Sequence, residues 1–253
     1  MTLAAFFEQI GPFLEGKESY PQAAARLYGD PPTPALARDA RRLRIYGRFC
    51  KLHRHEVIEL VCTETHAQVV VLLGEAVWEE LVDGYFRTVP MHHAELSANG
   101  DGWVDFLAAQ AAARGLPAWL AELSDLEQSE FRTGVAADDP SDAPDPALPL
   151  RIASTVDLRP YQHDLVAWLD HDAGDGPRPK APATRAVAVL FWRDVELDRR
   201  RENVSPLELA VLQAVMQGRD PLAAIGAETG VERGELCEVV EDLKAAGVLL
   251  GGA

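Results

Sequence analysis

The chain has 253 residues, of which 47% are hydrophobic and 25% are charged, a composition typical of folded globular proteins. It has 24 Lys and Arg against 40 Asp and Glu, so its formal net charge is -16. A chain this acidic repels a polyphosphate, which disfavours general nucleic-acid binding. Three cysteines are too few for a disulfide framework, and the longest apolar run, 186–192, is too short to cross a membrane. Since the first residues also lack the basic segment of a signal peptide, we expect a cytoplasmic protein.

Residues 134–149 interrupt the globular composition. Their sequence, GVAADDPSDAPDPALP, holds four prolines and four aspartates and almost no bulky apolar side chain, so it cannot nucleate a core. We expect an α+β protein with a helical domain at 1–135, a linker at 136–149 and a winged-helix-like domain at 150–253.

The first domain is expected to be all-helical. Apolar spacing and Gly or Pro breaks predict the following helices: 2–15, with Pro12 ending or kinking it early, a long helix from Ala35, and 64–73, 75–87, 102–114 and 117–131. One face of the long helix is apolar and is expected to be buried. It consists of Leu43, Tyr46, Cys50, Val57, Leu60 and Val61.

The opposite face of the long helix is basic. Residues 38–54 contain seven Lys or Arg and one Asp, a local charge of +6 in an acidic chain. Five of the cations follow one another at steps of three or four residues and form one stripe: Arg38, Arg41, Arg44, Arg48 and Lys51. The stripe is a solvated face paired with the chain's own carboxylates, a docking face for an acidic partner, or a phosphate-binding face.

The second domain begins with extended segments and ends with helices. Strands are predicted at 150–158 and 185–196, on either side of a short element at 161–169 and an exposed loop at 170–184. Val189, Phe191 and Arg193 share one face of the second strand, and we expect them to form a peptide-binding sheet edge.

After residue 196 the helical period returns. Helices are predicted from the capping box at Ser205 to about 217, at 221–228 and at 232–246, before a strand at 248–250. The last two helices and the strand resemble a winged helix-turn-helix. The would-be recognition helix has a charge of -3, however, so it would lose the counterion release that drives DNA binding. A winged-helix shape can instead bind an extended peptide along a sheet edge.

No motif indicates catalysis. The seven histidines include the pairs His53/His55 and His92/His93, whose spacing does not put two rings on one helical face. Nucleophile elbows, phosphate-binding loops and paired acid/base carboxylates are absent from the sequence. We therefore expect no catalytic residue, no metal ligand and no cofactor.

Several segments in order resemble one bacterial family. RLRIYGRF (42–49) is similar to its Arg-Leu-x-Val-Tyr-Arg opening, although Gly47 stands where a second Arg is common, and 62–74 lacks the usual Phe-Pro. The other similar segments are LLGEAVWEELVDGYFRTVP (72–90), DGWVDFLA (101–108), LPAWLAELSDLEQSEF (116–131) and FWRDVELDRRRENVSPLELAVLQAVMQGRDPLAAI (191–225). They resemble the HvfC/BufC-like family, once described as DNA-binding. It is now associated with partner proteins of multinuclear non-haem iron oxidases, which modify ribosomally made peptides in methanobactin and bufferin pathways.

The resemblance implies a non-catalytic subunit. It would bind the leader region of a precursor peptide and form a heterodimer with a TIM-barrel oxidase whose irons do the chemistry. The alternatives are a DNA-binding transcriptional regulator, a stand-alone enzyme and an interaction protein with another partner.

Overall fold

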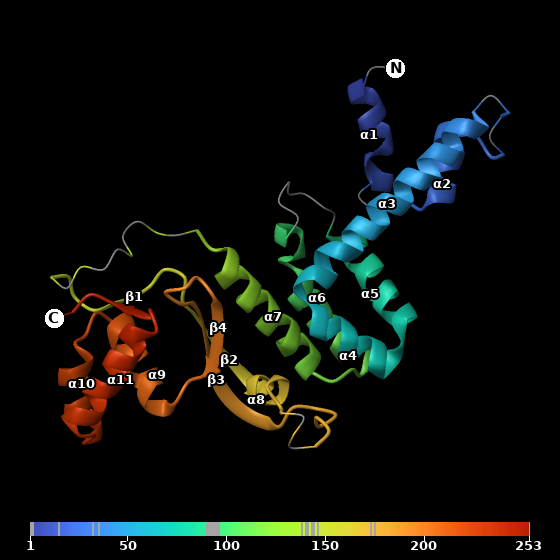
Figure 1. The fold of residues 1–253 in the computed structure, drawn as a ribbon. Helices are drawn as coiled ribbons and strands as arrows, with labels where there is room; N and C mark the ends of the chain where they lie inside the picture. The colour runs from blue at the N-terminus through green and yellow to red at the C-terminus, as the bar shows by residue number, and fades with distance from the viewer. Residues whose placement is uncertain are drawn as a thin grey trace. The chain divides into compact units, whose positions relative to one another are not determined.

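The protein, represented by a computed structural model, has a mostly helical N-terminal region followed by a mixed α/β part with small antiparallel sheets (Figure 1), which confirms the expected fold class. The structure describes residues 3–14, 16–31, 33–34, 36–89, 97–137, 139, 142, 145, 147–172, 174 and 176–252, with residues 3–7 and 227–229 described by their backbone alone. Internal contacts divide the chain into a first unit, residues 1–127, and a second unit, residues 128–253. The division falls inside helix α7 (Trp119–Val135).

The first unit consists of helices. They are α1 (Leu3–Leu14), α2 (Tyr20–Tyr28), α3 (Ala37–Val61), α4 (Thr63–Leu73), α5 (Glu75–Thr88), the 3-10 helix η1 (Ser97–Gly100), α6 (Trp103–Arg114) and the start of α7. Helix α1 continues through Pro12 to Leu14, so Pro12 does not end it. Helix α2 was not predicted, although Ser19 and Gln22 form a capping box at its start.

An aromatic cluster forms the core of this unit around α5 and α6. Trp78, Tyr85, Phe86 and Trp103 are fully buried. The rings of Tyr85 and Trp103 meet edge to face, with centroids 5.6 Å apart. Two of the polar atoms in the cluster find partners: Trp78 Nε1 donates to Glu59 over 3.0 Å, and Tyr85 Oη donates to the Asn99 carbonyl over 2.7 Å. Trp103 Nε1 is buried without a hydrogen-bond partner among the described residues. Burial raises the pKa of Tyr85 to about 12, so the hydroxyl stays a donor.

A close approach fixes α1 against α3. The ring of Phe13, which is buried, lies directly over Gly47 in the middle of α3. A Cβ atom at position 47 would stand 1.9 Å from Phe13 Cζ. Glycine normally destabilises the interior of a helix, but here only glycine leaves room for the Phe13 ring against the α3 backbone.

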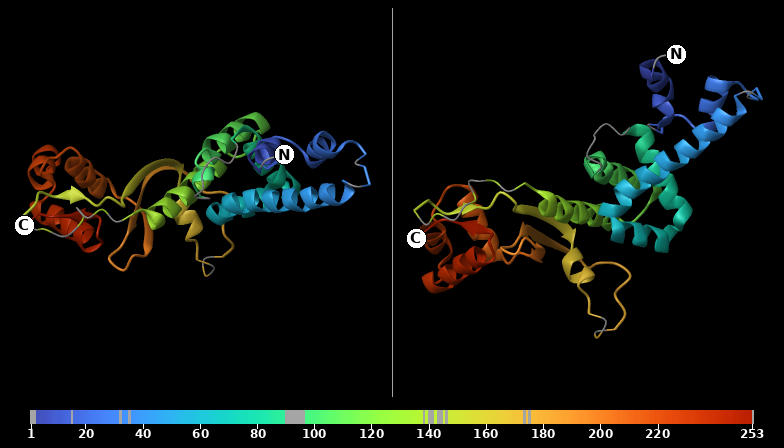
Figure 2. Two further views of the ribbon diagram at one scale, coloured as in Figure 1. Left: turned by 90° about the horizontal axis from the view of Figure 1, so that it is seen from above. Right: turned by 45° about the horizontal axis from the view of Figure 1, so that its top comes forward.

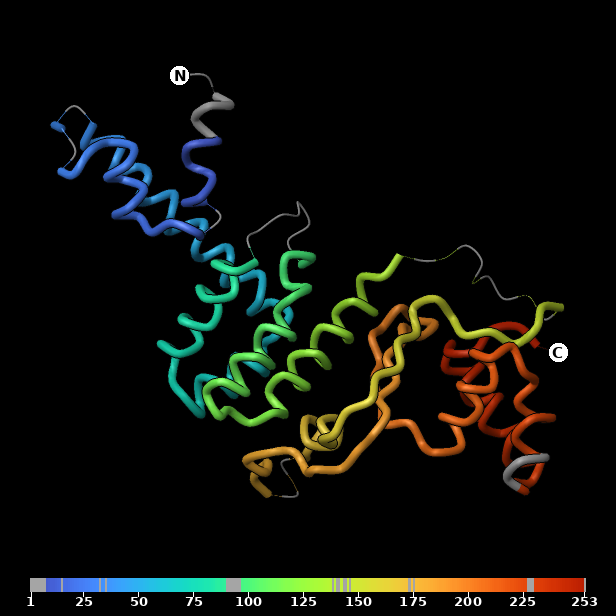
Figure 3. The backbone as a smooth tube through the Cα atoms, turned by 180° about the vertical axis from the view of Figure 1, so that it is seen from behind, coloured from blue at the N-terminus to red at the C-terminus, as the bar shows by residue number. Residues whose placement is uncertain are grey.

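In the described part of the second unit there are two small sheets and four helices beyond α7. Its elements are β1 (Arg151–Ile152), β2 (Asp157–His163), α8 (Leu165–Leu169), β3 (Thr184–Arg193), β4 (Arg199–Asn203), α9 (Pro206–Met216), α10 (Pro221–Thr229), α11 (Arg233–Ala245) and β5 (Leu249–Leu250). Strands β2, β3 and β4 run side by side in that order (Figure 3), and β1 pairs with β5.

Two strand predictions need correction. The segment 150–158 is not one strand: β1 ends at Ile152 and β2 begins only at Asp157. Strand β4 was missed, because its sequence RRREN has no apolar alternation. It forms because Asp194 organises the preceding turn, where its carboxylate accepts from the backbone N–H groups of Glu196 and Asp198, both over 2.9 Å. Leu197 takes a left-handed φ of 68° in this turn.

The helical end of the second unit follows the prediction. The capping box at Ser205 starts α9, Gly230 has a positive φ between α10 and α11, and β5 follows α11. Helices α9, α10 and α11 pack together (Figure 2) around Leu212, Leu236 and Leu243. Within the described residues, no helix is long and apolar enough to span a membrane. In the loop predicted at 170–184 all residues except 173 and 175 are described, and β3 begins at its last residue, Thr184. The histidines His92 and His93 and much of the predicted linker lie outside the described residues.

One partly buried carboxylate caps the start of α4. Glu127 on α7 accepts from the backbone N–H groups of Glu64 and Thr65, over 2.6 Å and 2.9 Å, and from Thr65 Oγ1 over 2.6 Å. Burial raises the pKa of Glu127 to about 7 despite these hydrogen bonds. Since an unperturbed glutamate titrates at 4.5, the folded protein holds this proton more tightly than the unfolded chain does.

Glu127→Gln tests this pH dependence. The contribution of Glu127 to stability is complete below pH 4.5 and is lost as the pH rises to about 7, because folding then requires burial of a charge. Relative to the permanently neutral variant, the wild type should lose about 3 kcal/mol over that range. Urea unfolding followed by tryptophan fluorescence measures this loss. The exposed Glu80→Gln should behave as wild type, and parallel profiles for wild type and Glu127→Gln would contradict the assignment.

Candidate functional site

The predicted basic stripe lies on α3 but divides into two parts. Arg38, Arg41, Arg44 and Arg48 are exposed, and no other described residue forms an ion pair with any of them. Lys51 is partly buried, and its Nζ contacts Glu79 over 3.0 Å and Asp83 over 3.2 Å. The four arginines therefore present uncompensated charge, whereas Lys51 is neutralised by the protein itself.

The expected buried face of α3 is only partly correct. Leu43 and Val57 are buried, and Cys50 and Val61 are partly buried. Tyr46 and Leu60 are 64% and 72% exposed, however. The helix is turned by its contact at Gly47, so the buried side is centred between Leu43 and Ile58 and does not reach Tyr46.

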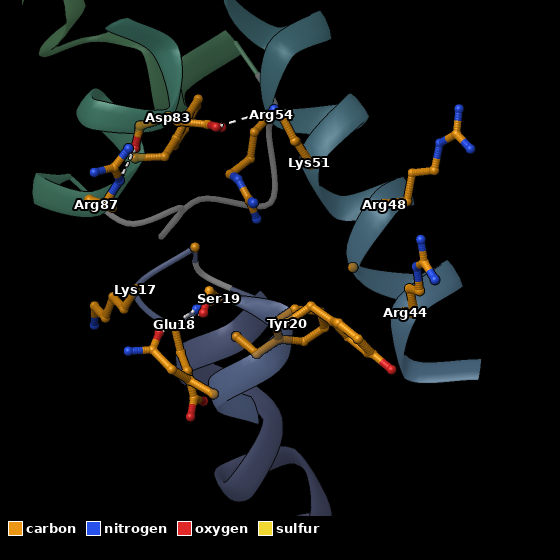
Figure 4. Close-up of a pocket in the computed structure, with 15 residues that line it drawn as sticks. Lys17, Glu18, Ser19, Tyr20, Arg44, Arg48, Lys51, Arg54, Asp83 and Arg87 are labelled. Carbon is orange, nitrogen blue, oxygen red and sulfur yellow. Dashed lines mark hydrogen bonds and ion pairs between the residues drawn. The ribbon is translucent and has the colours of Figure 1, made fainter. Parts of the chain in front are cut away.

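A pocket of about 570 Å³ opens between α1, α2, α3 and α5 in the first unit. Its lining includes Lys17, Arg44, Arg48, Lys51, Arg54 and Arg87. In Figure 4, Arg54 points into the pocket, whereas the guanidinium groups of Arg44 and Arg48 lie on the outer side of α3. Arg44 and Arg48 therefore belong both to the lining of the pocket and to the exposed basic stripe.

The buried Arg54 has a structural contact. Its Nη1 donates to the Leu14 carbonyl at the end of α1 over 2.7 Å, and burial lowers the pKa of Arg54. Nearby, burial opposes ionisation of Asp83, but hydrogen bonds from His55 and Lys51 outweigh it and lower the pKa of Asp83. The pocket-facing cations thus hold α1 and α5 against α3.

The peptide-binding prediction for Val189, Phe191 and Arg193 rests on an edge strand, and that premise is wrong. Strand β3 is the central strand, paired with β2 on one side and β4 on the other. Val189 and Phe191 are fully buried, and Arg193 Nη1 donates to the Ala136 carbonyl over 3.0 Å. Their side chains do lie on one face of β3. Val189 and Phe191, however, belong to the interior of the second unit, and Arg193 binds the chain just after α7.

Strands β2 and β4 are the two edges of this sheet, and β2 is the edge beside an apolar groove. Val204 N donates to the Ala188 carbonyl, so the polar groups of Ala188 face β4. Pro160 is the partner of Ala188 in β2, and the alternation of an antiparallel ladder therefore turns the backbone of Pro160 and Leu158 toward the outer edge. Proline lacks an N–H, and at this position its absence removes no hydrogen bond from the sheet.

An apolar groove lies beside this edge. Its volume is about 180 Å³, and it is lined by Ile152, Val156, Asp157, Leu158, Leu190, Leu212 and Met216. An apolar cavity of about 150 Å³ accommodates a benzene-sized group, so this groove can hold one large apolar side chain. Met216, at the end of α9, is 67% exposed at its rim. Edge and groove together can receive an extended segment with one apolar anchor.

The exposed side of α11 is acidic. Glu235, Glu238, Glu241 and Asp242 are exposed, and Lys244 is held by Glu241 and by the Gly252 carbonyl, over 3.1 Å and 3.3 Å. This surface would repel a DNA phosphate backbone.

The histidines have local partners. His55 is buried against Asp83, with Nε2 and Oδ1 3.2 Å apart, and His66 stacks on Trp78. Within the part of the chain that the structure describes, no three His, Cys, Asp or Glu side chains are grouped as a metal ion requires. Compared with known proteins, the chain matches no protein family and no curated protein.

Replacing Arg54 tests the structural contact. Arg54→Met leaves the Leu14 carbonyl without its donor and should lower the free energy of unfolding by about 1–3 kcal/mol. Arg48→Met, on an exposed side of the same helix, should change it by no more than roughly 0.5 kcal/mol. Urea unfolding measures both values. Equal stability of the two variants would rule out the contact assigned to Arg54.

Proposed function

We propose that the protein is a non-catalytic partner of an iron-dependent TIM-barrel oxidase, of the HvfC/BufC-like kind, and that it binds the leader region of a ribosomally made precursor peptide in the cytoplasm. It presents the peptide to the oxidase, whose irons perform the chemistry. The observation that carries the proposal is the outer edge of β2 with the apolar groove beside it.

The leader peptide adds to the sheet as a further strand on β2. Leu158 offers an N–H and a carbonyl to it, and Pro160 offers a carbonyl alone. Because this ladder is short, the apolar groove supplies much of the selectivity. The acidic surface of α11 favours a leader that is neutral or basic.

The oxidase docks on the basic stripe of α3. The four exposed arginines carry charge that no described carboxylate neutralises, so they complement an acidic surface. Arginine is enriched in protein interfaces because its planar guanidinium group can donate two parallel hydrogen bonds to one carboxylate.

DNA binding is the alternative function, and the same arginines are its strongest support. The acidic α11 opposes it, since the helix in the recognition position would meet phosphate with carboxylates. A fluorescently labelled duplex should show no binding even at low salt. Binding that weakens steeply with salt and disappears on reversal of Arg41, Arg44 and Arg48 would favour the regulator.

Leader binding is tested with Met216→Glu. A carboxylate at the rim of the groove should weaken binding of the synthetic leader peptide about tenfold, because the apolar anchor would be placed beside a charge. Isothermal titration measures the affinity, and hydrogen exchange should show new protection of the Leu158 amide in the complex. Val195→Glu alters an equally exposed apolar residue outside the groove and should bind normally. Unchanged affinity of Met216→Glu would remove the groove from the peptide site.

Oxidase docking is tested by co-expression. The wild type should purify as an equimolar complex with the TIM-barrel oxidase encoded by the neighbouring gene. Arg44→Glu with Arg48→Glu should reduce the affinity at least about tenfold, since both charges then repel the acidic surface. Lys180→Glu with Arg233→Glu makes the same change of net charge on the second unit and should leave the complex intact. Loss of the complex in the control pair alone would place the oxidase elsewhere.

A further inference from the structure

A face of α3 next to the basic stripe exposes large apolar side chains. Ile45, Phe49 and Leu52 are 57%, 66% and 49% exposed. They follow one another at steps of four and three residues, which is the spacing of a coiled-coil seam. Three bulky apolar groups in one exposed row are typical of a contact surface and unusual for a solvated helix.

Charged residues continue the row in both directions. Arg38 is followed four residues later by Arg42, and Arg42 three residues later by Ile45. At the other end, Glu56 follows Leu52 after four residues. The side chains of Arg42 and Glu56 are 65% and 72% exposed. Their contacts within α3 are long: 3.6 Å from Arg42 to Asp39, and 3.4 Å from Glu56 to His53. Such exposed pairs contribute little and are easily exchanged for better ones.

The row is complementary to itself when reversed. Arg42 lies seven residues before Phe49, and Glu56 lies seven residues after it. An antiparallel copy of α3 centred on Phe49 therefore sets Arg42 against Glu56 at both ends. Ile45 of each helix then lies within one residue, about 1.5 Å along the axis, of the level of Leu52 in the other, and the two Phe49 rings meet at the centre.

We propose that the protein forms a symmetric homodimer in which α3 packs antiparallel against α3 of a second copy through Arg42, Ile45, Phe49, Leu52 and Glu56. This inference is independent of the proposed function. A parallel arrangement would place Arg42 against Arg42, which is unfavourable. An acidic partner would satisfy Arg42 but repel Glu56, and DNA would leave Phe49 without an apolar contact.

The dimer is weak and reversible. From Arg38 to Leu60 the helix spans about 33 Å, so a single pair of helices buries less area than an obligate interface does. Arg44 and Lys51 lie on other sides of α3, which leaves part of the basic stripe outside the seam. An equimolar complex with another protein is therefore compatible with a dimer.

Sedimentation equilibrium of the full chain over a wide micromolar range tests the proposal. The wild type should show a monomer–dimer equilibrium, and Phe49→Glu should remain monomeric. Val71→Glu is the matched control, because Val71 is 77% exposed on α4, and it should dimerise as wild type. Circular dichroism shows whether each variant is folded. A monomeric wild type, or a Phe49→Glu variant that still dimerises, would overturn the proposal.

Charge exchange tests the antiparallel register. Arg42→Glu and Glu56→Arg should each weaken the dimer about tenfold, because each creates two like-charged contacts across the two-fold axis. The double variant restores opposite charges and should dimerise within about threefold of wild type. A double variant weaker than either single variant would reject the antiparallel pairing.

Discussion

The rotation of α3 about its own axis decides which of its side chains reach solvent. The contact between Phe13 and Gly47 fixes that rotation, since only a glycine lets the ring touch the helix backbone. Arg54 strengthens the same side of the helix by holding the end of α1. Once this side is inward, the arginines and the row around Phe49 must face outward. The outward surface of α3 thus follows from a contact made on its opposite side.

The helical period of the sequence predicts most of the α3 surface correctly, but it predicts a buried face that is too wide. The sequence predicts a basic stripe opposite an apolar one, and the arginines are exposed as expected. The buried sector is narrower than the apolar residues suggest, so Tyr46 and Leu60 are exposed. Ile45, Phe49 and Leu52 were overlooked because they lie between the two stripes. Their spacing in the sequence could have identified them, but apolar residues are usually assigned to a core.

The sheet shows a different limit of sequence reasoning. The helices α9 to α11 were predicted because capping and turn signals are local. The position of a strand within a sheet depends instead on partners far along the chain. Strand β3 has the most apolar sequence because it is the central strand, with neighbours on both sides. The edge strands are more polar, and β4 had no recognisable strand pattern at all. The apolar sequence of β3 therefore favours it as a peptide-binding edge, although a central strand has no free edge.

Pro160 has a consequence for the protein's behaviour in a crowded cell. An exposed strand edge has unpaired backbone N–H and C=O groups. Any extended chain, including a partly unfolded protein molecule, can pair with them and start an aggregate. Because Pro160 lacks an N–H, a strand added to the β2 edge forms only a few backbone hydrogen bonds. Non-specific strand addition is therefore too weakly stabilised to continue into an aggregate. In the proposed peptide complex, only a segment that also places a side chain in the apolar groove would be retained, so the proline that limits aggregation would also make peptide binding selective.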